Sequence, residues 1–339
     1  MEKIKILATT WHIMHYWDLC NALINDADFY LVHNSHRSWL DDRFSKIRPI
    51  PPNVFFVPYY EPNKYDLIIL NCDQQLANHD LGKYKIMKEL IDETRKYNDC
   101  PRIIINHGCP VYPEYLQTND MTERQAEIEC IKLIKEIIQD DTMVVNSYTA
   151  ASEKEWGWGY PIWHGMNSEE WLDLPKEPRV FTALSPGGCD KYYNRECMNE
   201  VARILDEQYN YRLMWAKANK KVETFDDYRR LLGSSLIYLD TSYRTPMNRA
   251  RTEAMFSGCC VIQIEGAHDL DKVYNGENMI IVKNNPSQIA KICVDLLEND
   301  YKKAIEIGKK GKETAKKLFN RERYRQDWLK LINQLIKKK

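Results

Sequence analysis

The sequence predicts an α/β protein with two Rossmann-like, doubly wound domains. Short apolar strands alternate with helical stretches along the chain, which is the pattern of a parallel sheet covered by helices. The alternation forms two series of similar length on either side of a proline-containing segment. The chain of 339 residues is also longer than one hydrophobic core usually organises.

The first series begins close to the N-terminus. We expect strands at 4–9, 29–32, 54–57, 67–70, 103–105 and 143–145, and helices at 81–96 and 122–139. Helical spacing of apolar residues supports the second helix, since isoleucines stand at 128, 131, 134 and 138.

The second series follows a predicted linker at 174–178, where two prolines interrupt both helix and strand. Its expected elements are strands at 180–184, 211–216, 236–239 and 261–264, and helices at 195–208, 225–232 and 249–257. We therefore expect a first domain over 1–173 and a second over 179–318. The segment 319–339 carries an apolar stripe from Trp328 to Ile336 that must be buried, and we expect its helix to pack back on the first domain.

Composition excludes several classes of protein. No apolar stretch approaches the length of a membrane span, and no signal-peptide layout opens the chain. The ten cysteines form no CxxC pair and have no zinc-like spacing, so a reduced compartment and no metal are expected. These features predict a cytoplasmic protein.

The charge is unevenly distributed. The net charge of −1 argues against a general nucleic-acid binder, yet residues 301–339 contain fourteen basic and four acidic residues. This basic C-terminal region is either the solvated face of amphipathic helices or a patch for an anionic acceptor or membrane surface.

Ligands of open parallel sheets bind where strands run into helices, and the segment 238–262 is such a place. Thr245 is the expected N-cap and Pro246 the first helical residue. The amides left free at this helix start belong to Met247, Asn248 and Arg249. A helix start attracts anions, and the side chains of Arg249 and Arg251 add positive charge.

Glu253 lies early in the same expected helix, which Gly258 ends. Its carboxylate has two interpretations that spacing alone leaves equal. It can accept hydrogen bonds from the two vicinal hydroxyls of a nucleotide ribose. It can also pair with Arg249, four residues earlier, as an ordinary helix-surface ion pair.

The loop after the strand at 180–184 suits a diphosphate. Gly187 and Gly188 allow close backbone approach to a ligand, and Lys191 and Arg195 supply positive charge. Taken alone, the segment is only a polar turn with two cations.

Histidines end two expected strands of the first domain. His107 precedes Gly108 after the strand at 103–105, and we expect it to project into a site. Trp11, His12 and His15 follow the first strand and are candidates for the acceptor side. Structural roles remain the alternative for each of them.

The second half resembles the group 1 glycosyltransferases of the GT-B fold, a glycosyltransferase family 4-like pattern. The resemblance is carried by Arg-Thr-Glu-Ala-Met-Phe-Ser-Gly-Cys-Cys-Val-Ile at 251–262 and by Tyr-Asn-Gly-Glu-Asn-Met-Ile-Ile-Val at 274–282. It covers residues from about 143 to the end and is weak before that point.

The resemblance implies a metal-independent, retaining transferase without a cofactor, using a nucleotide-diphosphate sugar, UDP-sugar foremost. It assigns the ribose to Glu253, the diphosphate to Lys191 and Arg195, and the donor sugar to His107. Met247, Asn248 and Arg249 fall on the loop whose amides hold phosphate or sugar. The acceptor hydroxyl stays open and could belong to a glycan, a lipid, a polymer or a nucleic acid base.

Two positions depart from the family pattern. Thr245 stands where the family usually has a second glutamate, eight residues before Glu253, and Trp11-His12 replaces a glycine pair after the first strand. These departures keep two alternatives open: a sugar-nucleotide epimerase or hydrolase on the same fold, and an inactive nucleotide-sugar-binding module.

Overall fold

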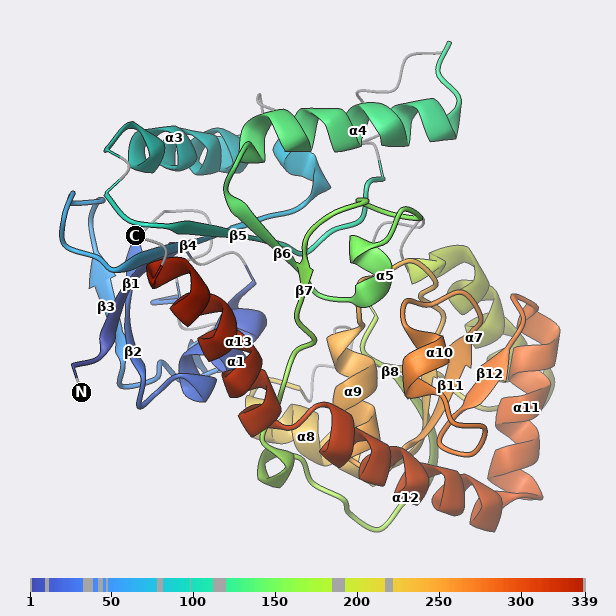
Figure 1. Cartoon of the computed structure of the whole chain (residues 1–339). Coiled ribbons are helices and arrows are strands. Elements are labelled where there is room, and N and C mark those ends of the chain that lie inside the picture. The colour runs from blue at the N-terminus through green and yellow to red at the C-terminus, as the bar shows by residue number, and fades with distance from the viewer. Residues whose placement is uncertain are drawn as a thin grey trace. The chain divides into compact units, whose positions relative to one another are not determined.

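A computed structural model of the chain divides into two units (Figure 1). Unit 1 contains residues 1–165 and 321–339, and unit 2 contains residues 166–320. The structure describes residues 2–9, 12–32, 39–41, 45–46, 48–77, 82–97, 99–111, 120–184, 193–216 and 222–337.

Unit 1 is built on a seven-stranded sheet in the order β3-β2-β1-β4-β5-β6-β7. Its strands are β1 (Ile4–Thr9), β2 (Ala27–Val32), β3 (Val54–Val57), β4 (Leu67–Cys72), β5 (Arg102–Asn106), β6 (Thr142–Val145) and β7 (Tyr160–Pro161). Every neighbouring pair is parallel. The carboxyl ends of β1, β4, β5 and β6 therefore meet along one edge of the sheet.

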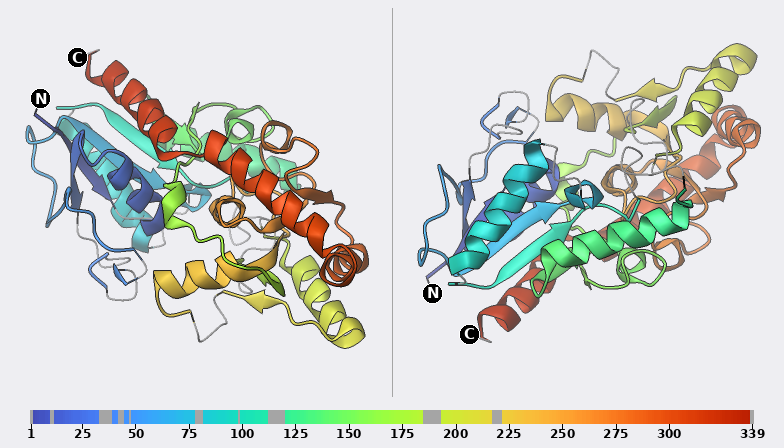
Figure 2. Two further views of the ribbon diagram at one scale, coloured as in Figure 1. Left: turned by 90° about the horizontal axis from the view of Figure 1, so that it is seen from below. Right: turned by 90° about the horizontal axis from the view of Figure 1, so that it is seen from above.

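Helices cover both faces of this sheet, as Figures 1 and 2 show. They are α1 (Ile13–Ala22), η1 (Gln74–Ala77), α3 (Gly82–Tyr97), α4 (Glu123–Ile138), α5 (Tyr148–Ala151) and α13 (Arg321–Ile336). One core joins α3 and α4 to the sheet, and a second joins α1 and α13 to its other face. Thr122 caps α4 through a reciprocal pair of hydrogen bonds with Gln125.

The C-terminal helix α13 belongs to unit 1. Trp328 and Ile332 are fully buried in the core that contains α1. Arg325 forms an ion pair with Asp26 at 2.6 Å, and an Arg323 guanidinium nitrogen donates to the carbonyl oxygen of Trp163 at 3.0 Å. Apolar burial and ion pairing therefore hold the end of the chain against the N-terminal fold.

Unit 2 is built on a five-stranded parallel sheet in the order β12-β11-β10-β8-β9. Its strands are β8 (Glu177–Thr182), β9 (Met214–Trp215), β10 (Ser235–Asp240), β11 (Cys260–Ile264) and β12 (Ile280–Val282). Its helices are η3 (Ser168–Glu170), α7 (Arg195–Tyr209), α8 (Phe225–Ser234), α9 (Arg249–Phe256), α10 (Leu270–Val273), α11 (Pro286–Glu298) and α12 (Tyr301–Leu318). Its core packs α7 and α11 against β8, β10 and β11.

The predicted linker at 174–178 is part of unit 2, whose first residue is Met166. Lys176 is buried there: its ammonium donates to the carbonyl oxygens of Gly233, at 2.6 Å, and Ser257. The same ammonium pairs with Asp173 at 3.2 Å. Pro175 precedes β8 and Pro178 lies within it, so the backbone enters this strand at Glu177 instead of forming a free connection.

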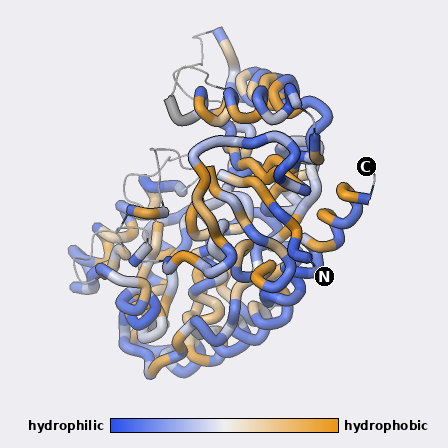
Figure 3. The backbone as a smooth tube through the Cα atoms, turned by 90° about the vertical axis from the view of Figure 1, so that its left-hand side faces the viewer, coloured by the Kyte–Doolittle hydropathy of each residue, from blue (hydrophilic) through white to orange (hydrophobic). Residues whose placement is uncertain are grey.

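The strand and helix pattern otherwise follows the sequence. Figure 3 shows apolar residues concentrated in the strands, while the helices alternate between apolar and polar positions. The nine cysteines in the described part of the chain are buried and free. No helix among the described residues is long and apolar enough to cross a membrane.

Candidate functional site

A continuous row of hydrogen bonds crosses the carboxyl edge of the unit 1 sheet. Asn71, near the end of β4, donates from Nδ2 to the carbonyl oxygen of Thr9 in β1 at 2.9 Å. Its Oδ1 lies 2.8 Å from Nε2 of His107, which follows β5. Nδ1 of His107 lies 3.0 Å from Nδ2 of Asn146, which follows β6. We call Thr9, Asn71, His107 and Asn146 the polar brace.

The brace determines the protonation of His107. Since Nδ2 of Asn71 is committed to a carbonyl oxygen, its Oδ1 faces His107 and must accept. Nε2 of His107 therefore carries the proton, and Nδ1 accepts from the amide of Asn146. Burial lowers the pKa of His107 well below its usual range, and the nearby His12 and His15 lower it further.

Two other imidazole rings lie near His107 in unit 1, and a third lies near His15. The ring centroids of His12 and His15 are 4.7 and 4.9 Å from that of His107. The ring of His164 lies 6.3 Å from that of His15. His12 and His15, both predicted for the acceptor side, thus gather with His107, whereas Trp11 lies outside the described residues.

Gly108 allows the chain to turn beside η1. A Cβ at this position would lie 2.1 Å from Oε1 of Gln74 and 3.0 Å from its backbone nitrogen, so no larger residue fits without rearrangement. The carbonyl oxygen of Gly108 accepts a hydrogen bond from Nε1 of the buried Trp156 at 2.9 Å. These contacts fix the backbone that follows His107.

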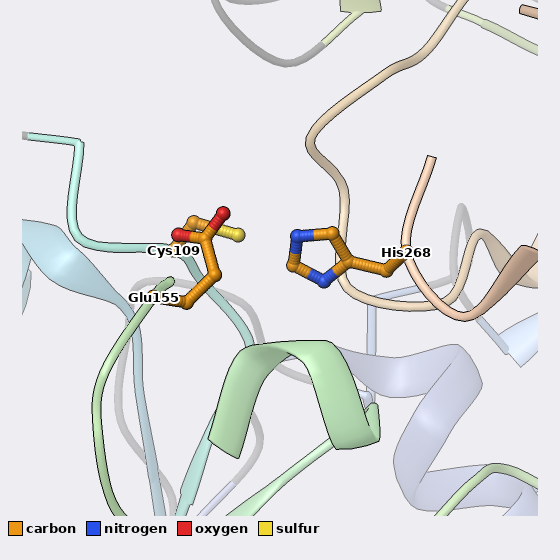
Figure 4. Close-up of side chains that lie close together, drawn as sticks. All are labelled: Cys109, Glu155 and His268. Atoms are coloured by element: carbon orange, nitrogen blue, oxygen red, sulfur yellow. The ribbon is translucent and has the colours of Figure 1, made fainter. Parts of the chain in front are cut away.

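Cys109 and Glu155 approach each other in unit 1, and Figure 4 shows their side chains together. The Cys109 sulfur and a Glu155 carboxylate oxygen lie within 4.8 Å, and both residues are buried. The third residue drawn, His268, belongs to unit 2. Two groups are fewer than the three or four protein ligands of a zinc site, so the described part of unit 1 presents no metal centre by itself.

In unit 2, α9 begins at Arg249, the first residue of the predicted helix 249–257, and not at Pro246. Its N-cap is Asn248, not Thr245, and Oδ1 of Asn248 accepts from the amide of Ala250 at 3.0 Å. The cap is held from behind, because Nδ2 of Asn248 donates to Asp240 at 2.8 Å. Met247 has a positive φ of 42° and is buried, so the chain turns sharply at this point and Pro246 cannot be the first helical residue.

Arg249 and Glu253 form an ion pair four residues apart on α9. The pair is not a surface pair, since the side chains are only 7% and 3% exposed. The hydroxyl of Tyr228, on α8, donates to the other carboxylate oxygen of Glu253 at 2.7 Å. Sequence spacing found the pair, but the burial and the tyrosine came only with the fold.

Arg251 lies beneath the start of α9 and is 1% exposed. Its guanidinium is 3.0 Å from the sulfur of Met247 and 3.4 Å from Oε1 of Gln263. Burial lowers the pKa of Arg251, while the charges of Asp240 and Asp269 oppose this shift. Arginine nonetheless stays protonated in proteins, so this is a buried cation compensated by carboxylates of its own unit.

The described residues include only part of the predicted diphosphate loop. Gly187, Gly188 and Lys191 lie outside the described residues. Arg195 is the first residue of α7 and is exposed. Thr245, half-buried before α9, has a hydroxyl without a hydrogen-bond partner in the described part of the chain.

No protein-family profile and no curated protein sequence matches the chain. Solved structures do match over nearly its whole length. Sucrose-phosphate synthase from Thermosynechococcus elongatus has a TM-score of 0.69 at 15% identity, covering 99% of this chain and 100% of that one. HepE from Anabaena, in complex with UDP and glucose, has a TM-score of 0.68 at 13% identity, covering 98% and 100%.

The chain has the GT-B fold. A glycosyltransferase from Rickettsia africae ESF-5 gives the same result, with a TM-score of 0.62, 12% identity and full coverage of both chains. The match extends the resemblance into the first 143 residues, where the sequence alone carried little of it. At these identities the similarity establishes the fold and no substrate.

Proposed function

We propose that this GT-B chain is a glycosyltransferase that moves a sugar from a nucleotide-diphosphate sugar, UDP-sugar foremost, to an acceptor hydroxyl. The similar structures support the proposal, since one is a glycosyltransferase by name and HepE holds UDP and glucose. The observation that carries it is the position of Glu253 on α9, directly after the loop that ends β10. In open parallel sheets, ligands bind in this place.

Glu253 can still serve a ribose in its paired state. Arg249 occupies one site on the first carboxylate oxygen, and Tyr228 occupies one on the second. A carboxylate offers about four lone-pair sites, and in this proposal the vicinal hydroxyls of the ribose share the carboxylate with Arg249 and Tyr228. The ion pair and the tyrosine then hold the carboxylate in a fixed orientation for the ribose.

In the proposed reaction, the bond between the anomeric carbon and the diphosphate oxygen breaks, and the acceptor oxygen bonds to that carbon. The acceptor proton leaves with the diphosphate. Because Arg249 pairs with Glu253 and Arg251 is buried, we assign the leaving diphosphate to the α9 amides, Arg195 and Lys191. Retention of configuration and independence of metal remain part of the proposal.

His107 has a restricted role in this scheme. Both ring nitrogens are engaged in the polar brace, and the imidazole is neutral. We therefore assign it no proton transfer. Its proposed task is to hold the carboxyl edge of the unit 1 sheet in shape, beside the candidate acceptor residues His12 and His15.

Calorimetric titration with UDP, GDP, ADP and CMP tests the proposal. The informative variant is Glu253→Gln, because its amide oxygen can still accept a hydrogen bond from Arg249 or Tyr228, whereas Glu253→Ala would leave both groups without an acceptor. Glu313→Gln is the matched control, since it removes an exposed carboxylate from unit 2. We expect one nucleotide to bind the wild type and the control, and to bind Glu253→Gln at least tenfold more weakly.

Turnover distinguishes a transferase from the alternatives. With a sugar donor that contains the nucleotide that binds, the sugar should appear on an added acceptor. Hydrolysis of the donor by water should be slower than this transfer. A chain that binds no nucleotide, or a Glu253→Gln variant that binds as well as the wild type, would contradict the proposed site. Nucleotide binding without turnover would favour the binding module.

A further inference from the structure

Six exposed lysines form a regular array on α12. They occur as adjacent pairs that repeat every seven residues: Lys302 and Lys303, Lys309 and Lys310, Lys316 and Lys317. Seven residues are nearly two helical turns, so the pairs lie on one side of the helix at intervals of about 10 Å. Together they span about 21 Å. We call these six residues the lysine ridge.

The opposite side of α12 is buried against the rest of unit 2, so the lysine ridge faces solvent. Ala304, Gly308, Gly311 and Ala315 are buried, and α12 packs against α9 and β11. A Cβ on Gly308 would lie 2.2 Å from the carbonyl oxygen of Gly258, which shows how closely the two backbones approach. The helix therefore cannot rotate to bury its lysines.

Most of the ridge has no internal counter-charge. Lys302, Lys309, Lys316 and Lys317 have no ion-pair partner among the described residues, whereas Lys303 and Lys310 lie 3.9 Å from Asp300 and 3.0 Å from Glu277. Two glutamates, Glu306 and Glu313, share the exposed side. The ridge and these two glutamates together carry a net charge of +4.

The basic C-terminal region is divided between the two units. Its other helix, α13, belongs to unit 1, and two of its arginines are compensated: Arg323 pairs with Asp327 and Arg325 with Asp26. In unit 2, the described lysines of this region that have no ion-pair partner all lie on α12. A surface made of repeated, unpaired lysines favours a partner with repeated negative charge.

We propose that the lysine ridge binds a flexible, linear phosphate-bearing polymer. An anionic membrane fits less well, because the lysine ridge would have to hold it by charge alone. No large apolar side chain of α12 is exposed to insert among lipids. Nucleic acid fits less well too, since no exposed aromatic side chain on α12 could stack a base.

A single polymer strand can lie along one helix. Its phosphates need only a spacing that lets them reach successive lysine pairs. This surface lies outside the proposed donor site and does not depend on it. The lysine ridge would hold the polymer on unit 2 whatever reaction the protein performs. The partner is thereby defined by its chemistry: phosphate groups repeated along a flexible backbone that carries no bases.

The test is fluorescence anisotropy of end-labelled inorganic polyphosphate titrated with the full chain at several salt concentrations. The ridge variant is Lys302→Gln, Lys309→Gln and Lys316→Gln combined. The charge-matched control replaces three exposed lysines of unit 1, Lys85, Lys132 and Lys154, with glutamine. Labelled single-stranded DNA and phosphatidylcholine vesicles containing one third phosphatidylglycerol are the competing probes.

The six lysines of the ridge would neutralise about six phosphates of the polymer. At about 0.7 per neutralised phosphate for a single strand, we expect the slope of log affinity against log salt to be near −4 for the wild type. The ridge variant should bind polyphosphate on the order of tenfold more weakly, with a slope near −2, and the control should match the wild type. Nucleotide binding should be unchanged in both variants.

Three results would overturn the proposal. One is wild-type protein that does not bind polyphosphate, and another is equal weakening in the ridge variant and the control. The third is ridge-dependent binding to vesicles or to DNA that is tighter than binding to polyphosphate. None of these results would bear on the donor site, which the nucleotide titration reports separately.

Discussion

The polar brace makes a quantitative prediction about Asn71. Its side chain is fully buried and makes two hydrogen bonds, one to the carbonyl oxygen of Thr9 and one from His107. Asn71→Leu keeps a side chain of similar volume but leaves both partners buried without a hydrogen bond. At about 1–3 kcal/mol for each of the two unsatisfied groups, the free energy of unfolding should fall by about 2–6 kcal/mol.

Urea denaturation followed by tryptophan fluorescence measures this loss. The control is Asn21→Leu, which removes one hydrogen bond at the half-buried edge of α1 and should cost less than about 1 kcal/mol. A loss below about 0.5 kcal/mol for Asn71→Leu would refute the brace, as would equal losses in the two variants. Such a result would mean that the row of hydrogen bonds does not hold this edge.

A second substitution at the same position tests the charge state of His107. Asn71→Asp places an anion where a neutral oxygen now accepts the Nε2 proton, so the pKa of His107 should rise. Histidine NMR spectra recorded across pH measure it. In the wild type, the nitrogen shifts should report the neutral, Nε2-protonated ring throughout the neutral range, and a ring that titrates normally there would contradict the assignment.

Three further substitutions probe packing and charge. Gly308→Ala should destabilise by about 1–2 kcal/mol in urea denaturation, because the clash with the Gly258 carbonyl outweighs the gain in helix propensity; a stabilised variant would contradict it. Trp328→Ala should cost about 3–5 kcal/mol and expose unit 1, not unit 2, to limited proteolysis. Burial would raise the pKa of Asp173, yet its two lysine partners lower it overall, so its stabilisation exists above about pH 4 and fades as pH falls. In Asp173→Asn, the free energy of unfolding should therefore fall less steeply as pH is lowered below about 4. The same pH dependence in this variant and in the wild type would contradict this.

The sequence predicted the two sheets well because their strands are apolar and separated by long helical stretches. β1 and β3 begin and end where the pattern placed them, at Ile4–Thr9 and Val54–Val57. β7 was missed, since two residues within an aromatic run give no period to detect. We predicted a linker at 174–178, whereas the second unit begins at Met166, and the prolines at 175 and 178 lie just before and within β8.

The candidate site was predicted in part. Glycine and basic positions after strands led to α9, but the cap moved from Thr245 to Asn248 because the Asp240 carboxylate holds the asparagine side chain. Asn71 was overlooked, although an amide within the apolar strand Leu-Ile-Ile-Leu-Asn-Cys is a signal that something must satisfy it. Tyr228 could not be found, because 25 residues separate it from Glu253 and only the fold joins them.

Hydrogen–deuterium exchange of the full chain with and without UDP tests the central claim most directly. If unit 2 binds the nucleotide at the start of α9, peptides covering residues 245–256 should exchange more slowly with UDP present. Glu253→Gln should abolish that protection at the same UDP concentration. Protection confined to unit 1, or none anywhere at saturating UDP, would contradict the proposed site.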